Sequence, residues 1–224
     1  RYLIGADGLI AHRHLGSGGW AETEEAVRAA LVEAGIDAAV LPPSLVPAPL
    51  PEPDIAVTRN LYFGFRHNYH PAGVYAAQPE YYEAPEEPVL LIDPGSRREF
   101  GLWYAHGEWS VDRDALIHAR ESQPEPDYVV FRFHAGRVSL LMTSTTGTPV
   151  DVIVQLDGFP LRRNAAGADV EWDSSGRSIV TVSDTRIYEI AELPDTADYQ
   201  MRLSTNDRGL ALFEASFDPT GTGQ

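Results

Sequence analysis

The chain has 224 residues, 43% of them hydrophobic, and a formal net charge of −16 at pH 7. Nucleic acids and anionic membrane surfaces would meet a repulsive field, so both are excluded as partners. No apolar run is long enough to span a bilayer. The chain contains no cysteine, which excludes a disulfide framework and a thiolate metal site.

The N-terminal segment predicts a β-hairpin followed by one helix. Two apolar strands, Tyr2–Ile4 and Leu9–Leu15, flank a turn that contains Asp7-Gly8, a pair that tolerates positive φ. The helix is expected at Glu22–Ala34, because acidic residues gather in its first turn and Gly35 follows its end. One hairpin and one helix cannot close a core. The apolar side of the helix is therefore expected to pack on the next domain or on an upstream segment.

A proline-rich stretch follows this segment and predicts a linker. Six of the thirteen residues in Leu41–Pro53 are proline, which favours an extended, semi-rigid spacer over regular secondary structure. We therefore divide the chain into an N-terminal hairpin and helix, a linker, a main domain and a short tail. Their expected bounds are residues 1–40, 41–57, 58–218 and 219–224.

The main domain predicts an antiparallel β-sandwich or barrel. Its short runs are rich in β-branched and aromatic residues, several alternate between apolar and polar, and turn signals such as Asp157-Gly158 separate them. The expected strands are Tyr128–His134, Arg137–Thr143, Val150–Leu156, Ser178–Ser183, Arg186–Ala191, Tyr199–Leu203 and Leu210–Phe217.

Several short motifs of the main domain follow one another in a definite order. They are Thr58–Gly64, Gly107–Trp109, Val154–Pro160, Ala166–Asp169, Arg186–Tyr188, Gln200–Leu203 and Leu212–Phe217. Together with the hairpin and helix, which resemble the end of a redoxin-type thioredoxin fold, they resemble the C-terminal region of DipZ-type thiol:disulfide interchange proteins. The resemblance covers nearly the whole chain.

This resemblance implies a fold and a location. In that family a membrane-embedded CcdA-like unit precedes an extracytoplasmic thioredoxin-like domain, and a jelly-roll domain resembling a carbohydrate-binding module follows. We therefore expect an antiparallel jelly-roll sandwich after an incomplete thioredoxin-like segment, located in the periplasm or cell envelope. The family's Cys-x-x-Cys motif is missing here, so its redox activity does not transfer. We expect a non-catalytic chain without a cofactor.

The resemblance to a sugar-binding module directs attention to aromatic residues between Leu61 and Trp109. Aromatic side chains can stack on pyranose rings while nearby polar groups bond the hydroxyls. The alternative is that most of these rings fill the core. If the strand around Gly107 has no bulge, Trp103 and Trp109 lie on one face of it. The candidate sugar-binding residues are the platforms Trp103, Trp109, Tyr62 and Tyr69, with His67 and Glu108 as hydrogen-bonding partners.

Two histidine pairs are weaker indications of a functional site than the aromatic residues. His12 and His14 lie on one side of a predicted strand, and His67 and His70 lie close in sequence. For His12 and His14 no third ligand lies nearby in the sequence, so polar residues on a solvent-exposed strand are the better interpretation. For His67 and His70 the better interpretation is an aromatic-rich loop with satisfied histidines, and no metal site is expected.

Three functions remain open from the sequence. The preferred one is a non-catalytic module that binds a glycan or envelope polysaccharide. The second is a scaffold that supports the missing thioredoxin half or binds protein substrates, without sugar affinity. The third is an unrecognised hydrolase that would use adjacent carboxylates such as Glu86 with Glu87, or Asp112 with Asp114.

Overall fold

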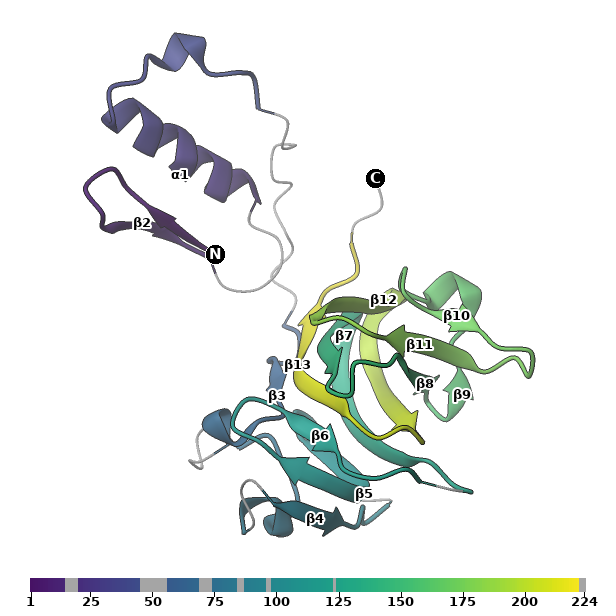
Figure 1. Ribbon diagram of the computed structural model, residues 1–224. Helices are drawn as coiled ribbons and strands as arrows, with labels where there is room; N and C mark the ends of the chain where they lie inside the picture. The colour runs from purple at the N-terminus through teal and green to yellow at the C-terminus, as the bar shows by residue number, and fades with distance from the viewer. Residues whose placement is uncertain are drawn as a thin grey trace. The chain divides into compact units, whose positions relative to one another are not determined.

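The computed structural model describes residues 1–14, 20–44, 56–68, 74–83, 87–95, 98–122 and 124–221. The chain forms two compact units, Arg1–Ile55 and Ala56–Gln224 (Figure 1). Within the described residues, no helix is both long enough and apolar enough to cross a membrane.

The first unit is the predicted hairpin and helix. Strand β1 (Tyr2–Ile4) pairs antiparallel with β2 (Ile10–Arg13). Helix α1 (Trp20–Glu33) follows, and a short 3-10 helix, η1 (Ala38–Val40), completes the unit. Gly35 adopts φ +93° beyond the helix, the left-handed conformation that ends many helices. No residue of α1 is buried, so the docking of its apolar side stays a prediction.

The second unit is an antiparallel β-structure, and its described residues include the short 3-10 helices η2 (Phe65–His67), η4 (Pro79–Tyr82) and η5 (Arg163–Ala165). Its sheet runs in the order β10-β11-β8-β12-β7-β13-β6-β5-β4, with β3 beside β13 and β9 beside β8. The strands are β3 (Leu61–Tyr62), β4 (Pro88–Leu91), β5 (Trp103–Val111), β6 (Leu116–His118), β7 (Asp127–Ser144), β8 (Val150–Leu156), β9 (Phe159–Pro160), β10 (Glu171–Trp172), β11 (Ser178–Val182), β12 (Arg186–Thr205) and β13 (Leu210–Asp218).

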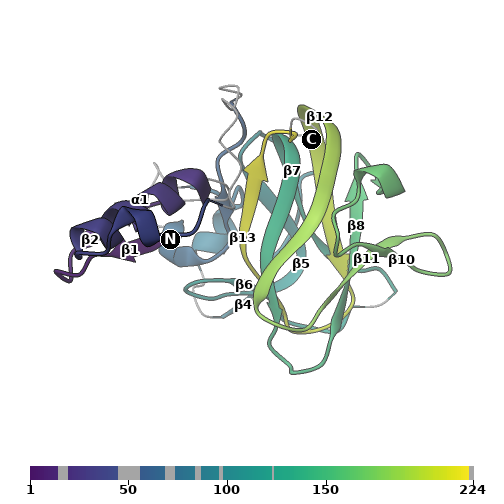
Figure 2. The same ribbon diagram turned by 90° about the horizontal axis from the view of Figure 1, so that it is seen from above.

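Two long strands fold this sheet onto itself. Strands β7 and β12 pair with each other along almost their whole length. The first part of β7 pairs on its other edge with β5, and the second part pairs with β13. Because β13 also pairs with β6, and β6 with β5, the sheet curls around a shared interior (Figure 2). This arrangement confirms the predicted mainly-β, jelly-roll-like sandwich.

The sequence predicted β7 and β12 as four separate strands, and this was wrong. Residues between Tyr128–His134 and Arg137–Thr143 continue β7, with Ala135 paired to Ala197 of β12. Strand β12 passes Pro194 by shifting its register between Glu192 and Ala197, an irregularity that accommodates a residue without an N–H group.

The core fills the space between the folded halves of the sheet. The predicted alternation in β8 is confirmed, since Val150, Val152 and Val154 are buried while Asp151 is exposed. Aromatic side chains form much of the core's volume. The largest fully buried ones are Trp103, Trp109, Tyr81, Tyr188, Phe63, Phe131 and Phe133.

Candidate functional site

The two tryptophans proposed as sugar platforms lie in the core. Trp103 is 0% exposed and Trp109 1% exposed. They share one face of β5, as predicted, because burial continues to alternate through Gly107. That face is the inner one, and both indole N–H groups donate to main-chain carbonyls, Trp103 to Tyr62 at 3.0 Å and Trp109 to His106 at 3.1 Å. The prediction of exposed platforms is therefore corrected: these rings pack, and neither presents a face to a ligand.

Two of the other predicted residues do come together. The rings of Tyr62 and His67 stack with their centroids 4.3 Å apart, and the ring of Tyr75 meets Tyr62 edge-on at 5.4 Å. Arg59 lies over the ring of Tyr75 at 4.4 Å. Burial, with smaller contributions from Glu214 and Tyr75, raises the pKa of Tyr62. This group stays a candidate ligand surface, although each ring already has a partner.

The remaining two predicted residues are placed apart or not at all. Tyr69 lies outside the described residues. Glu108 lies on β5 opposite Leu90 of β4, and its N–H donates to the carboxylate of Asp127 at 3.0 Å. In the described part of the chain, no hydrogen bond or ring contact joins Glu108 to Tyr62 or His67.

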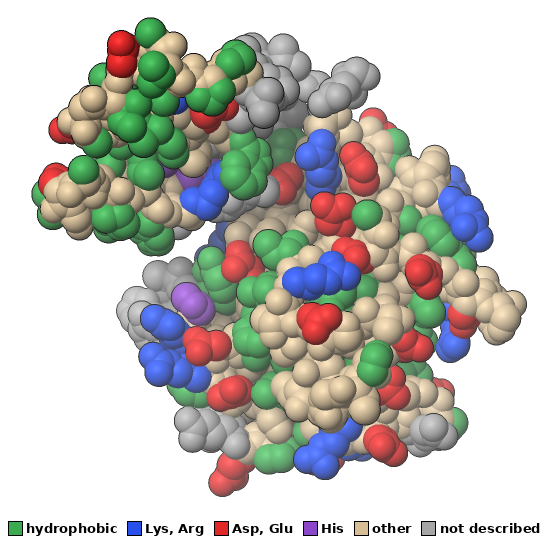
Figure 3. All heavy atoms as spheres, turned by 45° about the horizontal axis from the view of Figure 1, so that its top comes forward, with side chains coloured by type: hydrophobic (Ala, Val, Ile, Leu, Met, Phe, Trp, Pro, Cys, Tyr) green, Lys and Arg blue, Asp and Glu red, His purple; other side chains and the backbone are tan. Residues whose placement is uncertain are grey.

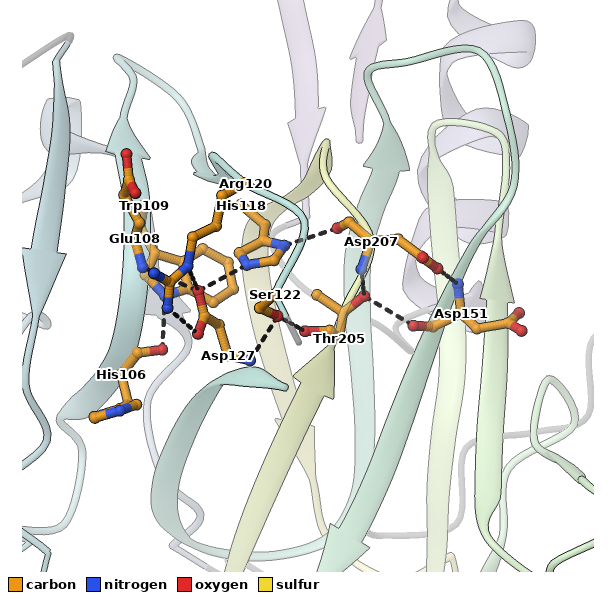
Figure 4. Close-up of polar contacts among 10 residues, drawn as sticks. All are labelled: His106, Glu108, Trp109, His118, Arg120, Ser122, Asp127, Asp151, Thr205 and Asp207. Atoms are coloured by element: carbon orange, nitrogen blue, oxygen red, sulfur yellow. Dashed lines mark hydrogen bonds and ion pairs between the residues drawn. The ribbon is translucent and has the colours of Figure 1, made fainter. Parts of the chain in front are cut away.

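Asp127 is the centre of a buried polar network (Figure 4). Its carboxylate accepts hydrogen bonds from His118 at 3.0 Å and from Arg120 at 2.8 Å on each oxygen. The second ring nitrogen of His118 contacts the carbonyl of Asp207 at 2.7 Å, so both ring nitrogens face acceptors. The N–H of Asp127 donates to Ser122 Oγ at 3.2 Å.

This network supports the fold and is closed to ligands. Asp127 and His118 are 2% and 0% exposed, and their partners come from β5, β6, the segment between β6 and β7, and the turn between β12 and β13. Burial acts to raise the pKa of Asp127, but the hydrogen bonds from Arg120 and His118 outweigh it and hold that pKa below its usual range. The ionised carboxylate thus joins three parts of the sandwich.

An open pocket of about 270 Å³ lies where β8 turns into β9. Its size is near the lower end of pockets that hold small ligands. The ring of Phe159 is 72% exposed at its rim, and Tyr199 contributes a second ring. The full lining is Leu156, Asp157, Phe159, Pro160, Leu161, Arg162, Asn164, Ala165, Leu193, Pro194 and Tyr199.

The turn that carries Phe159 is held firmly to β12. Asp157 adopts φ +52°, its N–H donates to the carbonyl of Gln200 at 2.8 Å, and its side chain accepts the Gln200 N–H at 2.8 Å. Beyond Phe159, the N–H of Leu161 donates to Ser178 Oγ at 2.9 Å. The exposed ring therefore stands on a fixed loop.

Sequence reasoning missed this pocket as a site. It used Asp157-Gly158 only as a turn signal and Val154–Pro160 only as a motif. The available signal was the apolar Phe159 placed directly after a tight turn, where a side chain has few neighbours to bury it.

The alternative metal and acid–base sites gain no support from the geometry. No group of three metal-ligating side chains occurs among the described residues. Asp112 and Asp114 are exposed; Asp112 accepts the N–H of Arg113, and Asp114 pairs with Arg66 at 3.6 Å. His70 and Glu86 lie outside the described residues.

Comparison with known families matches residues 58–217 to the model described as "Thioredoxin like C-terminal domain". The chain belongs to this family. The matched region contains the sandwich, the pocket and the Asp127 network. A search of curated proteins finds no match.

Solved structures that resemble this thioredoxin-like C-terminal domain include two family two carbohydrate esterases. The one from Cellvibrio japonicus has 13% identity and a TM-score of 0.40, over 60% of this chain and 33% of that one. The one from Clostridium thermocellum, in complex with cellohexaose, has 13% identity and a TM-score of 0.34, over 46% and 27%. This chain spans a third or less of either structure's length.

Proposed function

We propose that this chain is a non-catalytic, carbohydrate-binding-like recognition module of an extracytoplasmic DipZ-type thiol:disulfide interchange protein. Its role is to place a thiol–disulfide exchange domain near a glycan of the cell envelope. The observation that carries this proposal is the pocket beneath Phe159, an exposed ring on a fixed loop with polar side chains beside it.

The pocket combines the two kinds of group that a sugar requires. The faces of Phe159 and Tyr199 can cover the C–H surface of a pyranose ring, which displaces water from apolar area. Asp157, Arg162 and Asn164 line the same pocket and supply donors and acceptors for the hydroxyls. The proposed site thus replaces the two buried tryptophans by rings that solvent reaches.

A thiol–disulfide exchange reaction requires a thiolate nucleophile and a resolving thiol. The sequence contains no cysteine, so the exchange chemistry of this proposal belongs to a separate thioredoxin-like domain. The chain's own contribution is recognition.

A protein-interaction scaffold is the second candidate, and one observation favours it. Residues 1–40 expose many large apolar side chains, a feature typical of surfaces that meet another protein. They are Tyr2, Ile4, Leu9, Ile10, Trp20, Leu31, Val32, Ile36 and Val40, with exposed fractions from 37% to 70%.

A glycan array followed by titration tests the proposal. The wild-type chain is compared with Phe159→Ala and with Ile187→Ala, a control that removes another exposed apolar side chain, 62% exposed, from β12. We expect Phe159→Ala to weaken glycan binding by about 1–2 kcal/mol without lowering Tm, and Ile187→Ala to bind like the wild type. Absence of binding across the array would favour the scaffold. Glycan binding that Phe159→Ala leaves intact would place the site elsewhere.

A further inference from the structure

We propose that the open edge of β4 binds an extended peptide segment of another protein, which adds to the sheet as one more antiparallel strand. The segment that fits this edge has apolar side chains at alternate positions and a basic residue at its end. Since β8 and β4 lie far apart in the order of the sheet, the edge is a second surface, independent of the Phe159 pocket.

Strand β4 forms one end of the sheet, and in Figure 1 it lies at the lower margin of the sandwich. An unpaired edge offers main-chain N–H and C=O groups to another strand, and proteins protect such edges with charged residues, bulges, prolines or very short strands. At the other end of the sheet, β10 has only two residues. Strand β4 has four residues and no charge, and Pro88 is its one protective feature.

The hydrogen bonds of β5 show which groups of β4 face the open edge. In an antiparallel pair, opposite residues alternately exchange two hydrogen bonds and none. Leu90 lies opposite Glu108. The Glu108 N–H donates to Asp127 at 3.0 Å, and its C=O accepts the N–H of Ala119 at 3.0 Å. Glu108 therefore turns its main chain away from β4, and the N–H and C=O of Leu90 point to the open edge. No hydrogen bond reaches either group in the described part of the chain.

Pro88 fits the same pattern. It lies two residues before Leu90, opposite Ser110, so its main chain also points outward, where a residue without an N–H group removes no bond to β5. Its C=O and both main-chain groups of Leu90 are thus available to an added strand. An antiparallel segment can exchange two hydrogen bonds with Leu90, which satisfies both of its main-chain groups.

Apolar side chains border this edge on the outer face of the sheet. Leu90 is 57% exposed, and Ile92, which follows the strand, is 65% exposed. Leu91 between them is buried and belongs to the inner face. An added strand would place every second side chain beside Leu90 and Ile92, so the partner is expected to carry apolar residues at those positions.

The charges beside the edge indicate a basic partner. Glu87 is exposed directly before β4, and Glu108 lies opposite Leu90. Neither carboxylate forms a salt bridge or accepts a hydrogen bond among the described residues, and the nearby Arg120 pairs with Asp127. The chain has a formal net charge of −16, and acidic side chains are spread over the sandwich face seen in Figure 3. A basic residue beside the apolar positions therefore meets complementary charge.

A second copy of this chain fits the edge less well. Two β4 strands paired antiparallel at Leu90 would place Glu87 of each copy opposite Asp93 of the other, and each copy carries a net charge of −16. Four residues from each strand also fall well short of the roughly 20–30 residues a side of a stable interface. A separate basic peptide meets no such repulsion.

The probe is a short synthetic peptide in which valine alternates with threonine and lysine stands at both ends. Residues directly opposite each other share a face, so the valines lie beside Leu90 and their N–H groups face β4. Titration with the full chain compares this peptide with two forms, one N-methylated at the valines and one at the threonines. We expect methylation at valine to weaken binding at least about tenfold and methylation at threonine to leave it unchanged. Equal losses, or no binding of the parent peptide, would overturn the proposal.

Variants of the chain test the same contacts. Leu90→Pro removes the outward N–H but no bond to β5, so Tm should stay at the wild-type value while affinity falls at least about tenfold. Ile92→Thr should also weaken binding, whereas Ile187→Thr, at an exposed position of β12, should not. Glu87→Gln should reduce both the affinity and its dependence on salt. Unchanged binding by Leu90→Pro would contradict pairing at this edge.

Hydrogen exchange provides a measurement that needs no variant. In the free chain, the amide of Leu90 should exchange much faster than that of Val89, which faces β5, and saturating peptide should slow it. A Leu90 amide that is already protected in the dilute free chain would overturn the proposal. Protection that appears without peptide as protein concentration rises would assign the edge to a second copy and overturn it as well. None of these outcomes alters the glycan test at Phe159.

Discussion

The carboxylate of Asp127 fills the space that a side chain at position 107 would need. A Cβ atom built on Gly107 would lie 1.9 Å from Asp127 Cγ and 2.2 Å from Oδ2. Gly107 also adopts φ +106°, a conformation that side-chain-bearing residues rarely take. The glycine on β5 therefore makes room for the acid on β7, and the Glu108 N–H that follows it donates to that acid.

The first prediction is that Gly107→Ala strongly destabilises the sandwich. The substitution adds backbone strain of about 1–3 kcal/mol and displaces a buried carboxylate from its partners, at a further cost of about 1–3 kcal/mol. Urea unfolding should show a total loss of several kcal/mol. Gly176→Ala is the matched control, because Gly176 has φ +79° but nothing within 4 Å of its added Cβ. An equal loss in both variants would show that conformation alone, and not Asp127, constrains position 107.

The second prediction is that Asp127→Asn lowers the free energy of unfolding by about 3–5 kcal/mol at neutral pH. The variant removes the buried carboxylate that binds the fully buried His118 and the partly exposed Arg120. Asp198→Asn is the control, since its ion pair with His134 is exposed and should contribute no more than about 1 kcal/mol.

The same variant carries the third prediction, a dependence on pH. The pKa of Asp127 is lower in the folded chain than in the unfolded one, where it is about 3.9, so its contribution is complete above that value. The contribution is lost as pH falls through the folded-state pKa. The stability difference between wild type and Asp127→Asn should therefore narrow below about pH 4. A difference that stays constant down to about pH 2 would contradict an ionised Asp127.

The hairpin, the helix and the alternating strands could be predicted because their signals are local. Asp7-Gly8 and Gly35 fix the ends of their elements, and burial in β8 alternates from Val150 to Gln155. The continuity of β7 could not be predicted. Ala135-Gly136 resembles a turn in sequence, yet a Cβ on Gly136 would lie 2.1 Å from the Thr220 nitrogen. Gly136 is required because the segment at Thr220, far along the chain, packs closely against it. No local sequence pattern encodes that contact.

The candidate site could be predicted even less. Period-two alternation showed that Trp103 and Trp109 share a face, but it cannot say whether that face is inside or outside the sandwich. Only the pairing of β5 with β7 places it inside. The same holds for Arg132 and Arg202, which become neighbours only through the register of β7 against β12.

The fourth prediction addresses the tryptophans directly. Trp103→Ala and Trp109→Ala should each lower stability by about 3–5 kcal/mol, as expected for truncation of a buried ring. Phe159→Ala, at an exposed position, should change stability by no more than about 0.5 kcal/mol. Thermal and urea unfolding of the three variants gives the comparison. If the tryptophan variants fold like the wild type, the two rings do not pack in the core.

The last prediction concerns the order of local opening. Helix α1 buries none of its residues. Beside it, the described part of its unit has a two-stranded hairpin and the short η1, and a two-stranded hairpin is marginal in water. Strand β7, by contrast, has hydrogen-bonded partners on both edges and a buried inner face. Amide protons of Trp20–Glu33 should therefore exchange with solvent much faster than those of β7. Their rate should be close to that of a helix that packs against no other element. Hydrogen exchange read by NMR on the full chain measures both segments in one sample. Protection of α1 equal to that of β7 would show that its apolar side is covered in solution, as the sequence led us to expect.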